Sequence, residues 1–467
     1  MAVFSSAISS SNVQELTLKW QAKTRSYITS QPLSYSNNIL VCDWQGYIYC
    51  FDSESGNLIY DKQLYQPPKQ DGVFRKIPVL NKVLGEPLPY LWNGFAGSSC
   101  ISGGIWFIAS VGGKEGTMLT NGSAGRLYAV YASSGEILWE SALSEQIYSG
   151  SLAVPVCDDY HIYVGLCSVD EVASVAYKLK LKSFQPECTG EIFCFEKFTG
   201  RKIWRKKTVD LIIDDNPQAK GAGIWGGFSI PTSNSLVFST GNSYGQPASK
   251  ASDSVLSISK IDGRLQWCFQ AVANDAWMPL KPDGRDYDFG CTPLPFKCSK
   301  ASSNVAIGAG NKNGFLYAID SITGKLVWNT FCHFKSTPDD GIRSNITFDD
   351  GKIYVWSKNK KPRNSMCVNC IDADTGKVLW CVNRDGTNAM TTGAVTNDLY
   401  FLANYSGDIY ALNKNSGEEA WLTRIKKGAF GSDIAIYNNR IFAGLGVPKM
   451  YGGSTAVCGV ACYGFKP

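Results

Sequence analysis

A unit of about fifteen residues recurs seven times along the chain and constrains the fold more than any other feature. Each copy begins with an alternating apolar segment, passes through a polar turn that ends in glycine, and continues to an aromatic residue. The copies are GYIYCFDSESGNLIY at 46–60, GRLYAVYASSGEILW at 125–139, GEIFCFEKFTGRKIW at 190–204, SVLSISKIDGRLQW at 254–267, GFLYAIDSITGKLVW at 314–328, CVNCIDADTGKVLW at 367–380 and GDIYALNKNSGEEAW at 407–421. Self-similarity of this kind is typical of repeat architectures that stack or close into a ring.

Each unit is predicted to be a β-hairpin. Alternation with period two predicts a strand, and a turn glycine that can adopt positive φ suits a tight hairpin. In six units a tryptophan lies four residues after the glycine, and the first unit has Tyr60 there. We expect this aromatic to pack between adjacent sheets. A further apolar pair precedes each unit, such as 153–156 and 161–165, so each repeat is predicted to form a four-stranded antiparallel sheet.

An eighth unit begins near Gly428 and supplies three strands before the chain stops. The segment 15–22, which carries Trp20, is predicted to provide the missing outer strand, and this leaves no long open edge. We therefore predict an all-β single domain over 1–467, an eight-bladed β-propeller in which strand 15–22 completes the last blade, 428–467. A seven-bladed ring is the alternative if one unit is a decorated loop.

Charge and hydropathy exclude several classes of partner. There are 45 basic and 40 acidic residues and no long basic run, so neither nucleic acid nor a membrane surface is expected. No apolar run reaches the roughly 20 residues that span a bilayer. Residues 1–14 lack the charged start and the apolar core of a signal peptide. We expect a cytoplasmic protein, or a secreted one if a leader has been removed.

Most of the sixteen cysteines are interpreted as small apolar residues. At one register of the repeat cysteine alternates with alanine and serine, at Cys50, Ala129, Cys194, Ser257, Ala318, Cys370 and Ala411. Four cysteines in loops or at strand ends are better candidates for disulfides: Cys188, Cys291, Cys298 and Cys332. Cys367 and Cys370 lie three apart in a predicted strand and point to opposite faces, so a metal or redox role for this pair is not expected.

The repeat, with a tryptophan after its Thr/Ser-Gly turn, resembles the tryptophan-docking motif of quinoprotein alcohol dehydrogenases, which use pyrroloquinoline quinone (PQQ). Gly-Ile-Trp-Gly at 223–226, followed by Thr-Gly-Asn at 240–242, is similar to the polyvinyl-alcohol-dehydrogenase-like proteins of that superfamily. The resemblance covers essentially the whole propeller. It implies an enzyme that oxidises an alcohol with PQQ and calcium in a central funnel.

The resemblance also implies roles for individual residues. Trp225 matches the floor on which the quinone stacks, and Asn242 matches the amide that binds both cofactor and calcium. Lys312 matches the basic residue at the quinone oxygens. Asp275, in an Asn-Asp-x-Trp step, matches the catalytic base and is expected beside the metal.

The carboxylate ligand of the metal is expected at the strand end 165–171. Asp170 and Glu171 are both candidates, and the sequence does not choose between them. Asp286 and Asp288 follow in a polar loop and are less favoured candidates. Calcium takes oxygen ligands of this kind and polarises a carbonyl as a Lewis acid.

Two departures from the family leave other functions open. No adjacent Cys-Cys pair occurs, and the segment Tyr-Ile-Thr-Ser-Gln at 27–31 lacks a carboxylate that many relatives carry. The first hypothesis is a PQQ- and calcium-dependent enzyme with a small-molecule substrate and a separate electron acceptor. The second is a cofactor-free propeller enzyme that uses the same pocket for acid–base or cyclisation chemistry. The third is a non-catalytic propeller that binds a protein partner.

Overall fold

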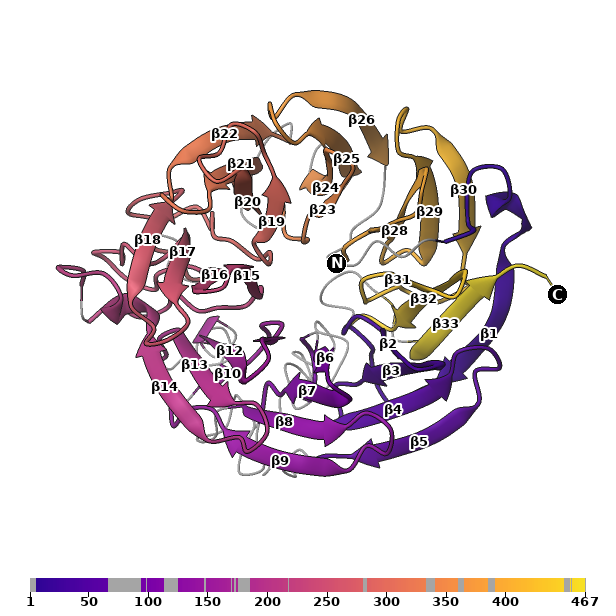
Figure 1. The fold of residues 1–467 in the computed structure, drawn as a ribbon, viewed down its shortest axis with the longest axis horizontal. Helices are drawn as coiled ribbons and strands as arrows, with labels where there is room; N and C mark the ends of the chain where they lie inside the picture. Colours follow the sequence, from indigo (N-terminus) through magenta and orange to yellow (C-terminus); the bar gives the residue numbers. More distant parts are fainter. Residues whose placement is uncertain are drawn as a thin grey trace.

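Eight antiparallel sheets form a closed ring around a central axis (Figure 1). The computed structural model describes residues 6–65, 94–97, 99–112, 125–146, 148–168, 170–171, 174, 185–216, 218–279, 284–332, 341–359, 365–384, 391–448, 454 and 456–466. Each sheet is one blade, with its first strand nearest the axis and its last strand at the rim. The predicted eight-bladed β-propeller is confirmed.

The first four blades follow the chain in order. Blade 1 contains β2 (Leu33–Tyr35), β3 (Asn38–Cys42), β4 (Tyr47–Asp52) and β5 (Leu58–Gln63). Blade 2 contains β6 (Cys100–Ser102), β7 (Ile105–Ala109), β8 (Arg126–Tyr131) and β9 (Ile137–Ala142). Blade 3 contains β10 (Ser149–Gly150), β11 (Val156–Cys157), β12 (His161–Ser168), β13 (Glu191–Glu196) and β14 (Lys202–Lys207). Blade 4 contains β15 (Phe228–Thr232), β16 (Ser235–Ser239), β17 (Ser254–Ser259) and β18 (Leu265–Gln270).

The other four blades each contain four strands, as predicted, whereas blade 3 has five because β10 and β11 both pair with β12. Blade 5 contains β19 (Leu294–Lys297), β20 (Val305–Gly310), β21 (Phe315–Asp320) and β22 (Leu326–Phe331). Blade 6 contains β23 (Thr347–Asp349), β24 (Lys352–Asn359), β25 (Ser365–Asp372) and β26 (Val378–Arg384). Blade 7 contains β27 (Ala394–Val395), β28 (Leu399–Ala403), β29 (Asp408–Asn413) and β30 (Glu419–Arg424). Blade 8 contains β31 (Ala435–Tyr437), β32 (Arg440–Leu445), β33 (Gly459–Gly464) and β1 (Thr17–Lys23).

The last blade is closed by the N-terminal strand, as predicted. β1 pairs antiparallel with β33, and Figure 1 shows the two side by side at the rim. β1 starts slightly later than the predicted 15–22 because Val13–Glu15 form a short 3-10 helix, η1. Its Trp20 donates an indole N–H to the carbonyl of Ser53 in blade 1, at 3.3 Å. This bond joins the end of the ring to its beginning.

Tryptophan docking repeats around the rim. The indole nitrogens of Trp139, Trp204, Trp267, Trp328 and Trp380 each lie 2.9–3.0 Å from a backbone carbonyl of the next blade. Tyr60 makes the equivalent bond through its hydroxyl, at 2.8 Å from the carbonyl of Ala132. Each ring also covers a turn glycine of the next blade, and the seven glycines have φ between 68° and 75°. A side chain at these positions would meet the aromatic ring, so the Thr/Ser-Gly turn and the aromatic residue depend on each other.

Apolar cores lie between neighbouring blades. The second and third strands are buried along almost their whole length because both of their faces pack against other blades, as β20 and β21 show. The outermost strands alternate between buried and exposed positions, as in β22. All seven residues at the Cys/Ala/Ser register are buried, which agrees with cysteine acting as a small apolar residue there.

The four cysteines predicted as better disulfide candidates do not pair. The sulfur atom of each lies near a backbone carbonyl, that of Thr189 for Cys188, Gly310 for Cys291, Asp374 for Cys298 and Thr330 for Cys332. All four side chains are buried, and all sixteen cysteines of the chain are free thiols. Over the described ranges, no helix has the length and hydropathy needed to cross a membrane.

Candidate functional site

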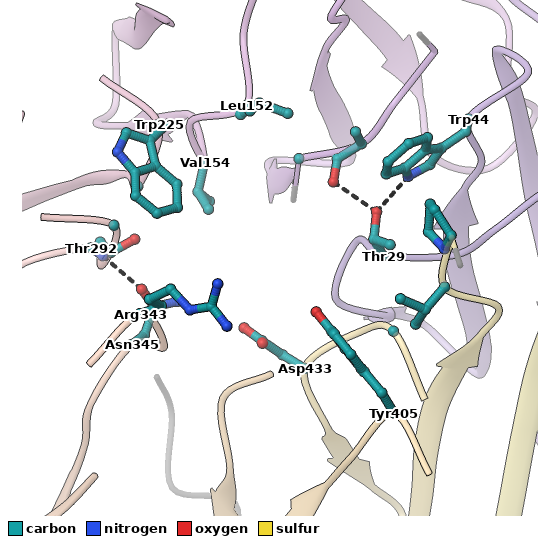
Figure 2. A pocket seen from close by; sticks show the side chains of 17 residues that line it. Thr29, Trp44, Leu152, Val154, Trp225, Thr292, Arg343, Asn345, Tyr405 and Asp433 are labelled. Atoms are coloured by element: carbon teal, nitrogen blue, oxygen red, sulfur yellow. Dashed lines mark hydrogen bonds between the residues drawn. The ribbon is translucent and has the colours of Figure 1, made fainter. Parts of the chain in front are cut away.

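The loops that precede the innermost strands meet at one end of the central channel. Strands in a blade alternate in direction, so residues before the first strand and after the second lie at the same end. These residues line a cavity of about 180 Å³ to which all eight blades contribute. Trp225 and Trp44 lie on opposite sides of it, and Arg343, Tyr405 and Asp433 form its polar wall (Figure 2). A second cavity of about 580 Å³ lies among the innermost strands themselves.

Trp225 lies just before β15 and lines this cavity (Figure 2). Its indole N–H donates to Oδ2 of Asp288 at 3.0 Å, whereas the rim tryptophans donate to backbone carbonyls. Gly290 packs so closely on the ring that a Cβ there would lie 2.1 Å from Cη2. The ammonium of Lys312 is 5.2 Å from the ring centroid. Three separate contacts therefore fix the orientation of this indole.

An acidic pair surrounds the Lys312 ammonium. Nζ lies 2.8 Å from Oδ1 of Asp286 and 2.7 Å from Oδ1 of Asp288, and all three side chains are buried. Burial lowers the pKa of Lys312, but the charges of Asp288, Asp286 and Glu171 outweigh this and hold the pKa above its ordinary value. Burial raises the pKa of Asp286 to about 6, although Lys312 opposes the shift.

Asn242 follows β16 and touches the same group of side chains. Its Nδ2 donates to Oδ1 of Asp286 at 2.8 Å. Its Oδ1 is buried and accepts no hydrogen bond from the described part of the chain. Glu171 is close enough to share in the electrostatics: burial raises its pKa to about 8, Lys312 opposes the shift, and Asp286 and Asp288 add to it. A buried amide oxygen without a donor is costly unless a bound group satisfies it.

The structure brings together Trp225, Asn242, Lys312 and one of the two residues left open at the strand end. That residue is Glu171, because the Asp170 carboxylate turns away to accept the backbone N–H of Cys188 at 2.9 Å. Burial raises the pKa of Asp170 to about 7. Asp170 therefore holds the backbone near 188.

Asp275, which the sequence analysis expected to be the catalytic base, is engaged in hydrogen bonds to the backbone of the loop that follows it. Its two carboxylate oxygens accept the backbone N–H groups of Arg285 at 2.6 Å and Tyr287 at 3.2 Å. A Cβ at Gly284 would lie 1.9 Å from Oδ1 of Asp275, so the loop follows the carboxylate closely. Asp275 thus shapes the loop that presents Asp286 and Asp288, the two residues that the sequence analysis favoured less.

Several residues of the cavity were missed by the sequence analysis. Trp44 donates its indole N–H to the hydroxyl of Thr29 at 2.7 Å, and both line the cavity with Arg343, Tyr405 and Asp433. Burial raises the pKa of Asp433 to about 6. Thr29 and Trp44 belong to blade 1, and the other three lie in three different blades without a shared repeat position, so no periodicity marks them. Their positions just before a first strand or just after a second strand are the signal that could have found them.

The ring of docked blades defines the chain as a PQQ-type propeller. The family model PQQ_2, described as outer membrane protein assembly factor BamB, matches residues 173–423 and 364–446. These matches span more than half of the sequence, and the chain belongs to this family.

Two of the relatives that match the chain are dehydrogenases by name. The chain is 24% identical over 334 residues to polyvinylalcohol dehydrogenase of Sphingopyxis sp. (strain 113P3). This match covers 63% of the chain and 50% of that protein. The chain is also 23% identical over 373 residues to quinoprotein alcohol dehydrogenase PedH of Pseudomonas putida. This match covers 68% of the chain and 60% of the relative. The chain therefore spans between half and three fifths of the length of these two relatives.

Solved structures agree on the fold. A europium-containing methanol dehydrogenase matches with a TM-score of 0.72 and 14% identity, over 98% of this chain and 94% of that one. BamB from Moraxella catarrhalis matches with a TM-score of 0.60 and 13% identity, over 96% of this chain and 100% of that one. At such identities the likeness concerns the propeller alone.

Proposed function

We propose that the protein is an oxidoreductase that oxidises an alcohol with PQQ and a hard metal cation bound at the mouth of the central channel. The observation that carries the proposal is the convergence of Trp225, Asn242 and Lys312 with three carboxyl side chains, those of Glu171, Asp286 and Asp288. The relatives whose names include quinoprotein alcohol dehydrogenase and polyvinylalcohol dehydrogenase support the same chemistry.

The donor set fits a hard cation. The Asn242 Oδ1 is buried without a donor among the described residues, and an amide oxygen is a preferred ligand of calcium. When the three carboxyl groups and Lys312 are all ionised, the cluster carries two net negative charges, which a divalent cation would neutralise. Among the described residues, no three His, Cys, Asp or Glu side chains are placed so that all of them could bind one metal ion, so the three carboxyl groups alone would not hold it. The Asn242 amide and the cofactor would therefore complete the coordination.

The cavity also fits a flat, anionic cofactor. The Trp225 ring is held rigidly between Gly290 and the Asp288 carboxylate and offers a plane for stacking. The Lys312 ammonium lies near one side of that plane, and Arg343 lines another part of the cavity (Figure 2). These two cations suit the carboxylates and quinone oxygens of PQQ. When bound, PQQ would supply the hydride acceptor.

We assign the proton-accepting role to Asp286. Its pKa of about 6 makes it a stronger base than an ordinary aspartate, yet it is ionised above neutral pH. The Lys312 ammonium and the Asn242 amide both bind its Oδ1, so its position is fixed. Asp275 becomes a positioning residue, which acts by holding the backbone at 285 and 287. The electrons would leave to a separate acceptor, and the compartment stays a prediction.

Reconstitution with PQQ and calcium, followed by alcohol-dependent reduction of a dye, tests the proposal. Asp286→Asn should retain PQQ binding and lose at least about 100-fold in kcat, because a general base contributes that much. Asp275→Asn should lower kcat together with the melting temperature, since it acts through the loop. An Asp286→Asn protein with wild-type kcat would overturn the assignment of the base. Turnover without PQQ or calcium would instead support the cofactor-free enzyme, and failure to bind PQQ would support a binding scaffold.

A further inference from the structure

Two cysteines of blade 6 bring their sulfur atoms together outside the channel. Cys367 lies in β25 and Cys381 lies in the outermost strand, β26. Their Sγ atoms are 2.7 Å apart. Cys381 is exposed, whereas Cys367 is buried. Neither residue belongs to the site described above.

The register of the two strands explains the contact. Cys367 is paired with Asn383, and Asn369 is paired with Cys381, so the two cysteines are diagonal neighbours on one face of the sheet. Nδ2 of Asn369 lies 3.5 Å from the Cys367 sulfur and 3.3 Å from the Cys367 carbonyl. The amide therefore lies alongside Cys367 on the face that carries Cys381.

Cys370 provides a natural contrast in the same strand. It lies three residues after Cys367, on the opposite face, and is paired with Trp380. It is fully buried in the apolar core between blades 6 and 7. Cys370 is thus a small apolar residue, whereas Cys367 faces a second thiol.

We propose that Cys367 and Cys381 form a disulfide bond when the protein meets an oxidising thiol–disulfide environment. The oxidant is a small-molecule disulfide, RSSR. The exposed Cys381 thiolate attacks one sulfur of RSSR, forms a mixed disulfide, and releases RS⁻. The Cys367 sulfur then attacks Cys381, the second RS⁻ leaves, and the two thiol protons end on the two RSH molecules. The two electrons lost by the cysteines reduce RSSR.

The surroundings favour attack by Cys381. The hydrogen bond from Cys367 holds the pKa of the Cys381 thiol below its ordinary value, so more thiolate is present at neutral pH. The product would link two strands across the hairpin turn 373–377 of blade 6. Such bonds persist in oxidising compartments and are rare in the cytosol. The state of this pair would therefore report where the protein resides, whether or not the proposed oxidoreductase function holds.

Peptide mapping of the full-length protein tests the proposal. The protein is reduced, the reductant is removed, and one half is incubated with oxidised glutathione before both halves are alkylated. The oxidised half should contain two fewer alkylated cysteines and one pair of peptides joined through 367 and 381. Before alkylation, the intact mass of the oxidised half should be lower than that of the reduced half by two hydrogen atoms. Cys381→Ser should remove this linkage, whereas Cys370→Ser should leave it unchanged.

Two results would overturn the proposal. Full alkylation of both Cys367 and Cys381 after oxidation would show that the thiols do not react. A stable glutathione adduct on Cys381 in folded protein would show that Cys367 does not complete the exchange. Far-ultraviolet circular dichroism of each variant establishes that it is folded.

Discussion

Tryptophan has two different uses in this propeller, one at the rim and one at the hub. At the rim, Trp328 donates its indole N–H to the carbonyl of Ala373 at 3.0 Å and covers Gly376. At the hub, Trp225 donates to the carboxylate of Asp288 and faces a cavity. The rim contact uses only backbone atoms of the neighbour, so the same pair of residues can recur in every blade. The hub contact needs a particular side chain, the carboxylate of Asp288, so it does not follow the repeat.

The acidic residues differ between the two regions in the same way. At the rim, Asp372 accepts hydrogen bonds from the Thr375 hydroxyl at 2.6 Å and from its backbone N–H at 2.8 Å. The hydroxyl bond is the main reason that the pKa of Asp372 lies below its ordinary value. At the hub, burial raises the pKa of Asp286, Asp433 and Glu171. Ionisation therefore stabilises the rim and is costly at the hub, which is typical of a site prepared for a bound group.

The largest predicted difference comes from removing one tryptophan from each region. Trp328→Ala should lower the free energy of unfolding by about 3–5 kcal/mol, because a buried ring is lost between two blades. Trp225→Ala should cost only about 1 kcal/mol, because the ring is partly exposed in a cavity. Urea unfolding of both variants measures the contrast. Equal losses would mean that Trp225 is another docking residue.

A smaller effect is expected when the hub loses its cation. Lys312→Met leaves three carboxyl groups without their ammonium and should cost about 3 kcal/mol at pH 8. The raised pKa values of Glu171 and Asp286 mean that these two groups become neutral as the pH falls, so the cost should shrink towards pH 5. Lys312→Arg, which keeps the charge, is the matched control. A loss that is independent of pH would contradict the electrostatic account of the hub.

Substitutions at two glycines of blade 6 distinguish the effect of tryptophan docking from the effect of backbone strain. Gly376 and Gly351 have φ of 73° and 71°, but only Gly376 lies under an indole, with a would-be Cβ 2.7 Å from Cε3 of Trp328. Gly351→Ala should cost about 1 kcal/mol, the strain of a left-handed residue. Gly376→Ala should cost about 1–3 kcal/mol more, because the methyl group displaces the ring. Equal melting temperatures for the two variants would show that the turn, not the docking, sets the requirement for glycine.

The smallest effects are opposite pH dependences in the two regions. The Asp433 pKa of about 6 lies above the ordinary value of about 4, so its contribution to stability is full below pH 4 and is lost as the pH rises through 6. Asp433→Asn should therefore be more stable than wild type by about 1–2 kcal/mol at pH 8, and equal to it at pH 4.

The pH dependence of stability that Asp372 contributes has the opposite sign to that of Asp433, because the pKa of Asp372 is lowered. Its stabilisation is present above pH 4 and is lost as the pH falls through the folded pKa. Asp372→Asn should cost less than about 1 kcal/mol at neutral pH, since the residue is only half-buried and solvent screens its interactions. Chemical denaturation at several pH values checks both variants, and parallel pH slopes would remove the distinction between rim and hub.

The fold could be predicted because the same sequence pattern recurs from blade to blade. Periodic alternation, a turn glycine and an aromatic residue four positions later recur in seven units, and Trp20 reveals where the eighth is completed. The structure refines only details, such as the start of β1 at Thr17 after η1.

The site was predicted less completely because its residues do not repeat. Trp225, Asn242 and Lys312 were anticipated from the family pattern, Glu171 was one of two candidates left open, and the structure brings the four together. The Asn-Asp-x-Trp match suggested Asp275 as the catalytic base. That its oxygens bind the backbone of 285 and 287 could not be predicted, because this contact exists only in the folded loop. The Cys367–Cys381 contact depends on strand register, which a bulge after Cys370 shifts. No local pattern in the sequence encodes these long-range placements.

Calorimetric titration of PQQ into the protein in the presence of calcium tests the central claim most directly. The account predicts one saturable binding event in the wild type and in Tyr60→Phe, which alters a rim docking contact. It predicts loss of that event in Trp225→Ala, with the protein still folded. No binding to the wild type at about tens of micromolar PQQ, a range that corresponds to only about 6–7 kcal/mol, would contradict the account. Equal binding to Trp225→Ala would contradict it as well.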